Sequence, residues 1–240
     1  MKKINNKIYI IHENDEWIIP LEKELRELNA PYDKWHMNSI SLDTSEEPPE
    51  GIFYNRMSAS SHTRGHRFAP EFTSIILDWL EYHKRKVING SRALNLEISK
   101  SLQYKELKKE GIKIPKSLFA KGKDQLLYLS KNFNRPFLTK HNRAGKGLGI
   151  RLFYEYRKFE EYVKSSDFEE SIDGITILQD YIKPKNNRII RTEFVGQKFL
   201  YAVQVDTTNG FELCPADNCD PNEEFCPANS NGNKFMILEN

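Results

Sequence analysis

Apolar and polar positions in the first ninety residues follow two different periods in turn. Short apolar runs rich in β-branched residues predict buried strands, and the segments between them repeat apolar residues every three or four positions, as amphipathic helices do. Strands are expected over residues 7–12, 34–40, 51–54 and 87–89, and helices over residues 20–29 and 71–83. Strands that alternate with helices are typical of βαβ units. The chain is therefore predicted to begin with an α/β domain.

Each of the two helices carries an apolar stripe, which predicts the face that it buries. In the first helix, Leu21, Leu25 and Leu28 share one face. The stripe of the second helix consists of Phe72, Ile75, Ile76, Trp79 and Leu80. Both stripes are expected to face the protein core.

A different pattern follows the first ninety residues. Ser99 can cap a helix that runs to about Glu110, and Gly111 stands where a residue in the left-handed conformation would end it. Further helices are expected over residues 124–130 and 153–165, and strands over residues 136–140, 175–182, 188–195, 198–206 and 235–240. Residues 196–197 (Gly-Gln) suit a hairpin turn. This part is predicted to be α+β with an antiparallel sheet, and the boundary to fall near residues 90–98.

The composition is that of an ordinary globular protein. Lys and Arg number 36 and Asp and Glu 34, which leaves a formal net charge of +2, whereas dedicated nucleic-acid binders carry a clear basic excess. Charged residues make up 29% and aromatic residues 12%, which argues against a disordered chain. No stretch approaches the roughly 18 consecutive apolar residues of a membrane span, and the apolar run near the N-terminus is too short for a signal peptide. We therefore expect a cytoplasmic protein that binds neither nucleic acid nor membrane.

Four stretches of the second part follow one another in an informative order. The first, SKSLQYKELKKEGIKIP from Ser99, places a lysine at a helix start and ends in Gly-Ile-x-x-Pro. The others are FLTKHNRAGKGLGI (137–150), ITILQDYI (175–182) and RIIRTEFVGQKFLYAVQVDT (188–207). Together they resemble the opening helix, the phosphate-binding strand with its glycine loop, the interlobe hinge and the arginine-bearing hairpin of ATP-grasp ligases. The nearest resemblance is to the RimK-like carboxylate–amine ligases, with YNRMSASSHTRGHR and CPADNC pointing to a separate branch of them.

The resemblance implies a domain organisation. Residues 1–95 would form the α/β domain that usually precedes the ATP-grasp fold and lies on the substrate side. Residues 96–240 would form the nucleotide-binding region, with a small lobe over 96–180 and the start of a large lobe over 181–240. The fold class expected is α/β plus α+β, in the ATP-grasp architecture.

The phosphate-binding groups are expected around the second stretch. A triphosphate carries several negative charges and needs cations and backbone N–H donors. Lys100 adds its charge to the positive end of a helix dipole, and Lys140 ends a strand. Glycine lets a backbone approach phosphate oxygens without a Cβ clash, and the loop between Lys140 and the next strand contains Gly145, Lys146, Gly147 and Gly149. A glycine triplet alone is usually only a turn, and lysines are usually solvated, so the interpretation depends on the order of the four stretches.

The hinge stretch is expected to bind adenine. Adenine needs an acceptor for its N6 amino group and a donor for N1, and the backbone of Asp180, Tyr181 and Ile182 can supply both, while Gln179 can accept from N6. The family often places an acidic residue for the ribose just after the hinge, but residues 184–187 contain none. Glu193 is a substitute that the sequence supports only weakly.

Arg191 is the expected catalytic residue. A charged side chain on a strand that faces inward must find a partner. The resemblance implies that Arg191 contacts the γ-phosphate or an acyl phosphate, and the alternative is an exposed arginine on an edge strand. Phosphoryl transfer needs positioning and charge neutralisation more than a protein base.

The loop over residues 55–67 (NRMSASSHTRGHR) is unusually polar and follows a predicted strand, where α/β folds bind ligands. We interpret it as a site for an anionic substrate, most plausibly a carboxylate, with Arg56, Arg64 and Arg67 as clamps. A solvated, mobile loop explains the pattern nearly as well. His62 and His66 are spaced as zinc ligands on a helix would be, but Gly65 and the polar setting argue against zinc.

The C-terminal part contains three cysteines, Cys214, Cys219 and Cys226, without a CxxC pair or a following histidine, so neither a disulfide framework nor zinc is favoured. The family holds Mg²⁺ with late acidic residues and an Asn. Glu239 and Asn240 are a weak candidate pair, and nothing singles out Glu212 or Asp217. We expect the metal ligands to lie beyond residue 240; a chain that ends there would bind nucleotide poorly and turn nothing over. Equal activity of this chain and a longer version would contradict that expectation.

Three functions are compatible with these features. The first is a ligase: ATP phosphorylates a small-molecule or peptide carboxylate, and an amine, or less plausibly a thiol, attacks the acyl phosphate, with Mg²⁺ as cofactor. The second is a catalytically silent nucleotide sensor or scaffold with an ATP-grasp clamp. The third is a kinase that stops at phosphorylation. The sequence does not identify either substrate and leaves open a homo-oligomer.

Overall fold

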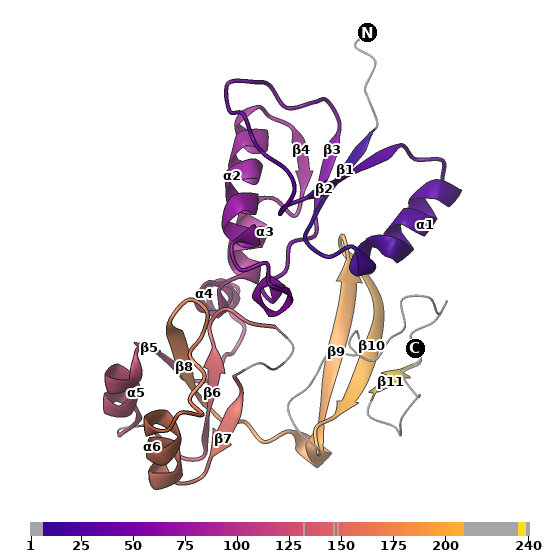
Figure 1. The fold of residues 1–240 in the computed structure, drawn as a ribbon. Helices are drawn as coiled ribbons and strands as arrows, with labels where there is room; N and C mark the ends of the chain where they lie inside the picture. The colour runs from indigo at the N-terminus through magenta and orange to yellow at the C-terminus, as the bar shows by residue number, and fades with distance from the viewer. Residues whose placement is uncertain (1–6, 132, 146, 148, 209–234, 239–240) are drawn as a thin grey trace. The chain divides into compact units, whose positions relative to one another are not determined.

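The computed structural model describes residues 7–131, 133–145, 147, 149–208 and 235–238 (Figure 1). The chain divides into two compact units. The first contains residues 1–114 together with residues 142–145, and the second contains residues 115–141 and 146–240. Residues 142–145 therefore pack with the first unit, although the residues on both sides of them in the sequence belong to the second unit.

The first unit contains a parallel four-stranded sheet in the order β2-β1-β3-β4. Its strands are β1 (Ile8–His12), β2 (Tyr32–His36), β3 (Ile52–Asn55) and β4 (Lys86–Ile88). Its helices are α1 (Ile19–Glu27), α2 (Ala69–Tyr82), α3 (Ser91–Glu97) and α4 (Lys100–Lys109), with 3₁₀ turns at Glu16–Ile18 and Ser61–Arg64. The predicted α/β organisation is confirmed.

Strand β1 supplies both faces of the sheet's core. Side chains alternate along a strand, so Tyr9 and Ile11 pack on the side completed by α2, whereas Ile10 packs with Ile18 and Leu25 on the side of α1. Figure 1 shows these two helices on opposite sides of the sheet. Complete burial of such an aliphatic side chain contributes roughly 1.5–3 kcal/mol.

Two predicted core positions are wrong. Leu28 is 74% exposed and Ile75 is 53% exposed. Leu28 follows the last residue of α1, so the helical period no longer directs it to the sheet. On α2, fully buried Leu77 lies beside Ile76 and Leu80, which turns the buried stripe away from Ile75.

The second unit contains two antiparallel sheets. The first has the order β5-β8-β6-β7, from β5 (Ser117–Lys121), β6 (Phe137–His141), β7 (Arg151–Phe153) and β8 (Ile175–Asp180). Helices α5 (Lys123–Ser130) and α6 (Tyr156–Lys164) share a core with one face of this sheet. The second sheet has the order β11-β10-β9, from β9 (Arg188–Val195), β10 (Lys198–Asp206) and β11 (Phe235–Leu238); a 3₁₀ turn, Lys185–Asn187, precedes it.

The elements that the sequence did not predict are short. They are α3, β5 and β7; α3 buries only Leu94 along its length, and β7 has three residues. Such segments are too short to repeat a period. Strand β2 begins earlier than expected and ends at His36, and β8 ends at Asp180 instead of Ile182. No helix within the described part of the chain is long and apolar enough to span a membrane.

Candidate active site

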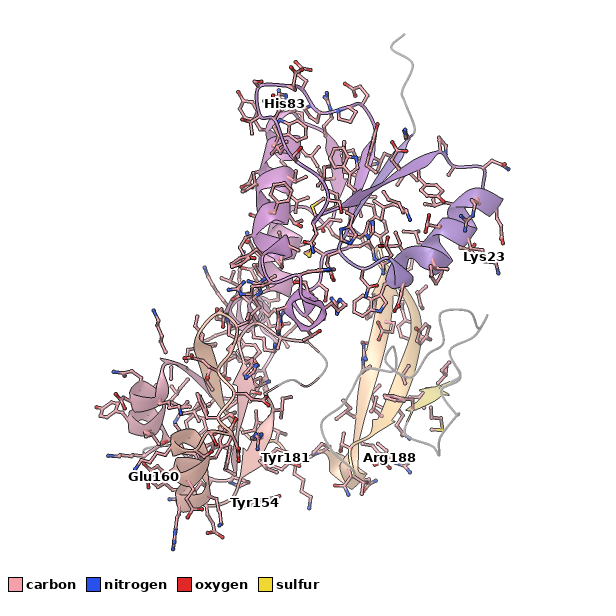
Figure 2. The ribbon with its side chains drawn as sticks, in the orientation of Figure 1. Lys23, His83, Tyr154, Glu160, Tyr181 and Arg188 are labelled. Carbon is pink, nitrogen blue, oxygen red and sulfur yellow. The ribbon has the colours of Figure 1, made fainter. Side chains whose placement is uncertain are left out.

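A cavity of about 500 Å³ lies in the second unit, beside the end of β8. The strand register explains its wall: Leu138 on β6 stands opposite Gln179 on β8 and Leu152 on β7, so all three side chains share one face of the sheet. The opposite face packs against α5 and α6. Tyr154 and Tyr181, labelled in Figure 2, also line the cavity. The predicted hinge residues 179–182 all belong to its wall.

Two backbone N–H groups at the hinge already donate hydrogen bonds within the protein. The N–H of Asp180 donates to the carbonyl of Lys116 at 3.0 Å, and that of Tyr181 donates to the carbonyl of Pro136 at 3.3 Å. Residues 181–184 then lie outside regular secondary structure, and Ile182 is 67% exposed. The Gln179 amide nitrogen donates to Ser117 Oγ at 2.8 Å. A ligand in this cavity therefore meets the backbone after Tyr181 more readily than the groups before it.

Asp180 carries a buried carboxylate oxygen that the sequence analysis did not consider. Its Oδ1 is buried without a hydrogen-bond partner within the described residues. Asp180 stands opposite Phe137, which packs with α5 and α6, so its side chain lies on the face of the sheet away from Leu138 and Gln179. The carboxylate is therefore not assigned to the cavity, although the residue lines it.

Two predicted phosphate-site cations lie on the cavity side of their strands. Lys140 is two residues after Leu138 on β6 and therefore points to the same face. Arg191 lies two residues after Ile189, which lines the cavity, and its guanidinium is 3.0 Å from the carboxylate of Glu193 on the same face of β9. Arg191 thus has an acidic partner, and the proposed ribose role of Glu193 competes with this ion pair.

In the first unit, Lys100 contacts the start of the glycine loop. Ser99 caps α4 as predicted, and the Lys100 ammonium donates to the carbonyls of Asn142, at 3.4 Å, and Ala144. The first N–H groups of α4, which a helix cannot satisfy internally, donate to the same segment. Lys100 N–H donates to the Asn142 carbonyl at 3.3 Å, and Ser101 N–H donates to Asn142 Oδ1 at 3.0 Å. The structure therefore brings together the predicted lysine and the residues that open the loop.

Arg143 ties this segment to α2. Its guanidinium, of which 5% is exposed, donates to both carboxylate oxygens of Glu71, at 2.6 and 3.2 Å, and to the carbonyl of Arg67 at 3.2 Å. Arg67 also donates to Glu71, at 2.7 Å. Partial burial opposes ionisation of Glu71, but the hydrogen bonds from Arg143 and Arg67 outweigh it and lower the pKa of Glu71 to about 2.

The glycines of the loop differ in their roles. Gly145 lies against Ser60 of the polar loop, where an added Cβ would be 3.7 Å from the Ser60 Cβ. Gly147 and Gly149 have left-handed φ angles of 86° and 71°. A Cβ on Gly149 would also overlap the imidazole of His141. Lys146 lies outside the described residues, so its predicted role stays a prediction.

A second cavity, of about 400 Å³, lies in the first unit at the carboxyl end of β3. Its wall includes Trp17, Arg56, Ser58, Asn89 and Glu97. Such a position, outside the carboxyl ends of parallel strands, is where open α/β sheets bind ligands. The predicted polar loop therefore borders a cavity, which supports the substrate-site interpretation over that of a merely solvated loop.

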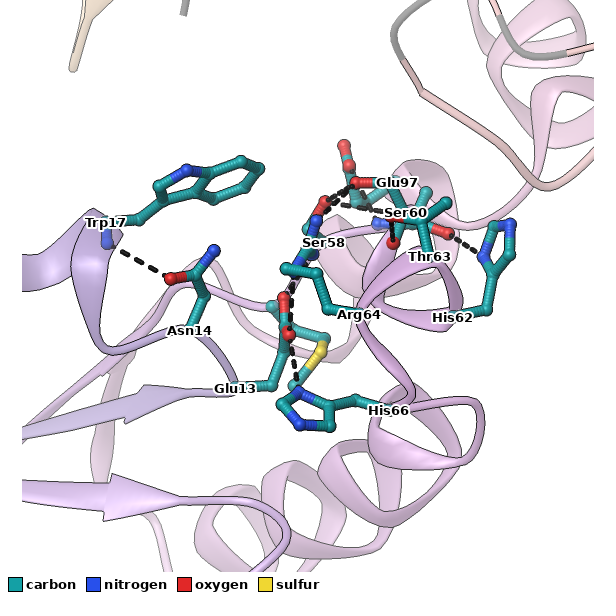
Figure 3. A network of polar contacts seen from close by, with 12 residues as sticks. Glu13, Asn14, Trp17, Ser58, Ser60, His62, Thr63, Arg64, His66 and Glu97 are labelled. Carbon is teal, nitrogen blue, oxygen red and sulfur yellow. Dashed lines mark hydrogen bonds and ion pairs between the residues drawn. The ribbon is translucent and has the colours of Figure 1, made fainter. Parts of the chain in front are cut away.

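The three arginines of that loop have different environments. Arg64 is bound to the buried carboxylate of Glu13 through two nitrogens and lies over the ring of Trp17 (Figure 3). Arg67 is paired with Glu71. Arg56 lines the cavity and stacks near Tyr54, and within the described residues it has no ion pair. Among the three predicted clamps, Arg56 is the one that lines the cavity and has no carboxylate partner within the described residues.

Glu13 organises the inner side of the polar loop. Its oxygens accept from Arg64 and from His66 Nδ1, at 2.9 Å, and Arg64 continues the network to Ser60 at 3.3 Å and hence to Ser58 (Figure 3). Burial raises the pKa of Glu13, but the bonds from Arg64 and His66 outweigh it and hold that pKa below its usual value. His66 is thus a partner of Glu13, which argues against the zinc role that its spacing to His62 allowed.

Metal ligands are not identified in the described part of the chain, which contains no group of three or more His, Cys, Asp or Glu side chains arranged to hold a metal ion. The acidic and amide candidates named above, Glu212, Asp217, Glu239 and Asn240, and the three cysteines lie outside the described residues. The structure therefore gives no residue set to which Mg²⁺ can be assigned.

Sequence reasoning missed the acidic partners, Glu13, Glu71 and Glu97, and the loop residues Asn142 and Arg143. Glu97 accepts from the Ala59 N–H at 3.1 Å, which fixes the polar loop beside the second cavity. Most of their contacts join residues at least 38 positions apart, which no local pattern shows; the exception is the bond between Glu71 and Arg67, four positions away. One signal was present: Asn142 and Arg143 are bulky polar residues at the start of a loop otherwise rich in glycine.

Comparison with solved structures identifies the fold. The chain resembles the RimK domain protein ATP-grasp from Sphaerobacter thermophilus DSM 20745, with 13% identity, a TM-score of 0.59, and coverage of 88% of this chain and 77% of that one. It also resembles D-alanyl-alanine synthetase A from Vibrio cholerae, with 12% identity, a TM-score of 0.57, and coverage of 84% and 67%. A third similar structure is the ATP-grasp ligase PsnB complexed with a precursor peptide and AMPPNP, with 14% identity, a TM-score of 0.53, and coverage of 85% of this chain and 74% of that one. The fold is therefore the ATP-grasp fold, as predicted.

Comparison with family models is more specific. Residues 98–212 match the model of the RimK-like ATP-grasp domain, and the predicted resemblance is confirmed. No curated protein matches the chain. The match begins close to the predicted boundary at residues 95 and 96, whereas the compact units divide at Ile114, so the domain limits stay a prediction.

Proposed function

We propose that the protein is an ATP-dependent ligase that joins a carboxylate to an amine. The carboxylate oxygen would attack the γ-phosphorus of ATP and release ADP. The amine would then attack the acyl carbon, lose a proton and expel inorganic phosphate. The observation that carries this proposal is the contact of Lys100 with the residues that open the glycine loop, next to a polar loop that borders a cavity.

In this proposal, adenine enters the cavity of the second unit. The backbone after Tyr181 would pair with the edge of the base. Lys100, Lys140, Lys146 and the loop N–H groups would bind phosphates, and Arg191 would stabilise charge on the transferring group. Arg191 would have to exchange Glu193 for phosphate oxygens.

The carboxylate substrate is proposed to bind in the cavity of the first unit. Arg56 would bind it by a charge-assisted hydrogen bond, because its charge is not neutralised by an ion pair within the described residues. Arg64 and Arg67 would instead hold the loop in shape through Glu13 and Glu71. Mg²⁺ would supply charge neutralisation at the phosphates, as it does in phosphoryl transfer generally. A cytoplasmic location stays a prediction from the sequence.

The test is an assay of ADP release with ATP, Mg²⁺ and pooled amino acids and small peptides. A ligase releases ADP only when both a carboxylate and an amine are present. Release without an amine would indicate the kinase, and saturable ATP binding without release in any pool would favour the sensor. With an active pair in hand, Arg56→Ala should raise the KM for the carboxylate at least tenfold and leave the KM for ATP unchanged, since a charge-assisted hydrogen bond contributes about 1.5–3 kcal/mol. The exposed Arg157→Ala is the matched control.

A further inference from the structure

The four residues after β6, Asn142–Gly145, pack with the first unit, and Arg143, the one charged residue among them, is buried. We infer that Arg143 is a positioning residue that fixes the start of the glycine loop, and that Glu71 is the carboxylate through which it does so. The inference deepens the proposed function, because it assigns a role in nucleotide binding to two residues outside the phosphate site itself.

The geometry of the pair is suited to positioning. A guanidinium that binds both oxygens of one carboxylate is fixed in direction as well as distance, which a lysine cannot reproduce. Arg143 does this with only 5% of its side chain exposed, and its Nε is buried without a partner within the described residues. A buried charge of this kind is strongly destabilising when its partner is removed. The main chain at residue 143 is therefore held close to α2.

The same carboxylate also holds the polar loop. Glu71 accepts from Arg67 as well as from Arg143, and Arg143 donates to the Arg67 carbonyl. Two residues further on, Gly145 lies against Ser60. The start of the glycine loop and the loop that borders the substrate cavity are thus fixed to each other by one ion-pair cluster and one close contact.

Lys100 makes this arrangement relevant to nucleotide. Its ammonium binds the carbonyls of Asn142 and Ala144, the residues on either side of Arg143. The position of Lys100 and the point from which the glycines start therefore both depend on the backbone that Arg143 anchors. Loss of the anchor should weaken ATP binding although Arg143 itself touches no phosphate in this account.

The experiment measures the ATP dissociation constant of the full chain, well below its melting temperature, for the wild type, Arg143→Ala, Arg143→Lys, Glu71→Gln and the Arg143→Ala/Glu71→Gln double variant. We expect Arg143→Ala to weaken ATP about tenfold, corresponding to about 1.4 kcal/mol. Arg143→Lys should recover part of the loss, and the double variant should be no weaker than the weaker single variant. Hydrogen exchange of the amides in residues 142–150 should accelerate in Arg143→Ala without nucleotide.

A matched control separates positioning from mere stability. Arg92→Ala removes an exposed ion pair with Glu106 in the same compact unit and should leave ATP binding unchanged. If Arg143→Ala melts earlier but binds ATP within about twofold of the wild type, a difference of about 0.4 kcal/mol, the inference is wrong while the proposed function stands. If the wild type itself binds no ATP, the proposed function and the inference fail together.

Discussion

The imidazole of His12, at the end of β1, is 1% exposed, and neither of its ring nitrogens has a hydrogen-bond partner within the described residues. His36 lies opposite His12 on β2, and the two rings meet edge to face with their centroids 5.0 Å apart. Burial is the main cause that lowers the pKa of His12, and His36 lowers it further, while Asp15 and the backbone of Asn14 oppose them; the net shift is downward. The neutral ring is therefore the form that this position stabilises.

This position predicts a pH dependence of stability. Because the pKa of His12 is lower in the folded than in the unfolded chain, its contribution to stability is complete above the unfolded value of 6.5 and is lost as pH falls through the folded value. The free energy of unfolding of the wild type, measured relative to that of His12→Leu, should therefore decrease as the pH falls from neutral to acid. Denaturant titrations of both proteins on each side of pH 6.5 check this, and parallel pH profiles would contradict it.

The candidate site was predictable at residue scale only where chemistry is local. Lys100 was identified from its place at the start of a capped helix, and it does contact the glycine loop. The partner of Arg64 was not predictable, because an arginine in a polar loop has the same sequence pattern whether it faces a ligand or a buried glutamate. Only the tertiary contact with Glu13 distinguishes these cases.

Secondary structure was predictable where an element repeats its period or carries a specific end signal. Helix α4 begins after Ser99 and ends before Gly111, whose φ is +74°, as the capping pattern indicated. The hairpin of β9 and β10 turns at Gly196, with φ of +62°. The short β5 and β7 lack a period and complete the sheet only through pairing with β8 and β6, which no local pattern encodes.

The glycine loop predicts a stability difference between two glycines. Gly149 and Gly174 both have left-handed φ angles, 71° and 72°, so an alanine at either costs roughly 1–2 kcal/mol in backbone strain. Only at Gly149 would the new Cβ also overlap His141, whereas a Cβ added at Gly174 would meet no side chain or backbone atom of a non-neighbouring residue within 4 Å. Gly149→Ala should therefore lower the free energy of unfolding more than Gly174→Ala.

Chemical denaturation of the two variants measures that difference. In a His141→Ala background the imidazole is absent, and the two substitutions should become nearly equal in cost. If Gly149→Ala costs no more than Gly174→Ala in the wild-type background, the close approach of residue 149 to His141 is wrong. The loop then would not have the backbone position from which its N–H groups are proposed to bind phosphate.

For the whole molecule, the order of the sequence motifs was more informative than any single motif. The match over residues 98–212 confirms the resemblance that this order indicated. The cavity beside the hinge lies in one compact unit, and the contacts of Lys100 lie in the other. The cavity beside Arg56, which is proposed to bind the substrate, has a wall assembled from separate elements, and such a wall is not visible in sequence.

The central claim is that the cations around the glycine loop bind polyphosphate. Equilibrium titration of the chain with ATP in the presence of Mg²⁺ tests it most directly, with Lys100→Ala as the test variant and Lys108→Ala, exposed on the last turn of the same helix, as the control. We predict saturable binding that Lys108→Ala retains and that Lys100→Ala weakens at least tenfold, or about 1.4 kcal/mol. Absence of saturable binding at millimolar ATP, or equal binding by Lys100→Ala and the wild type, would contradict the account.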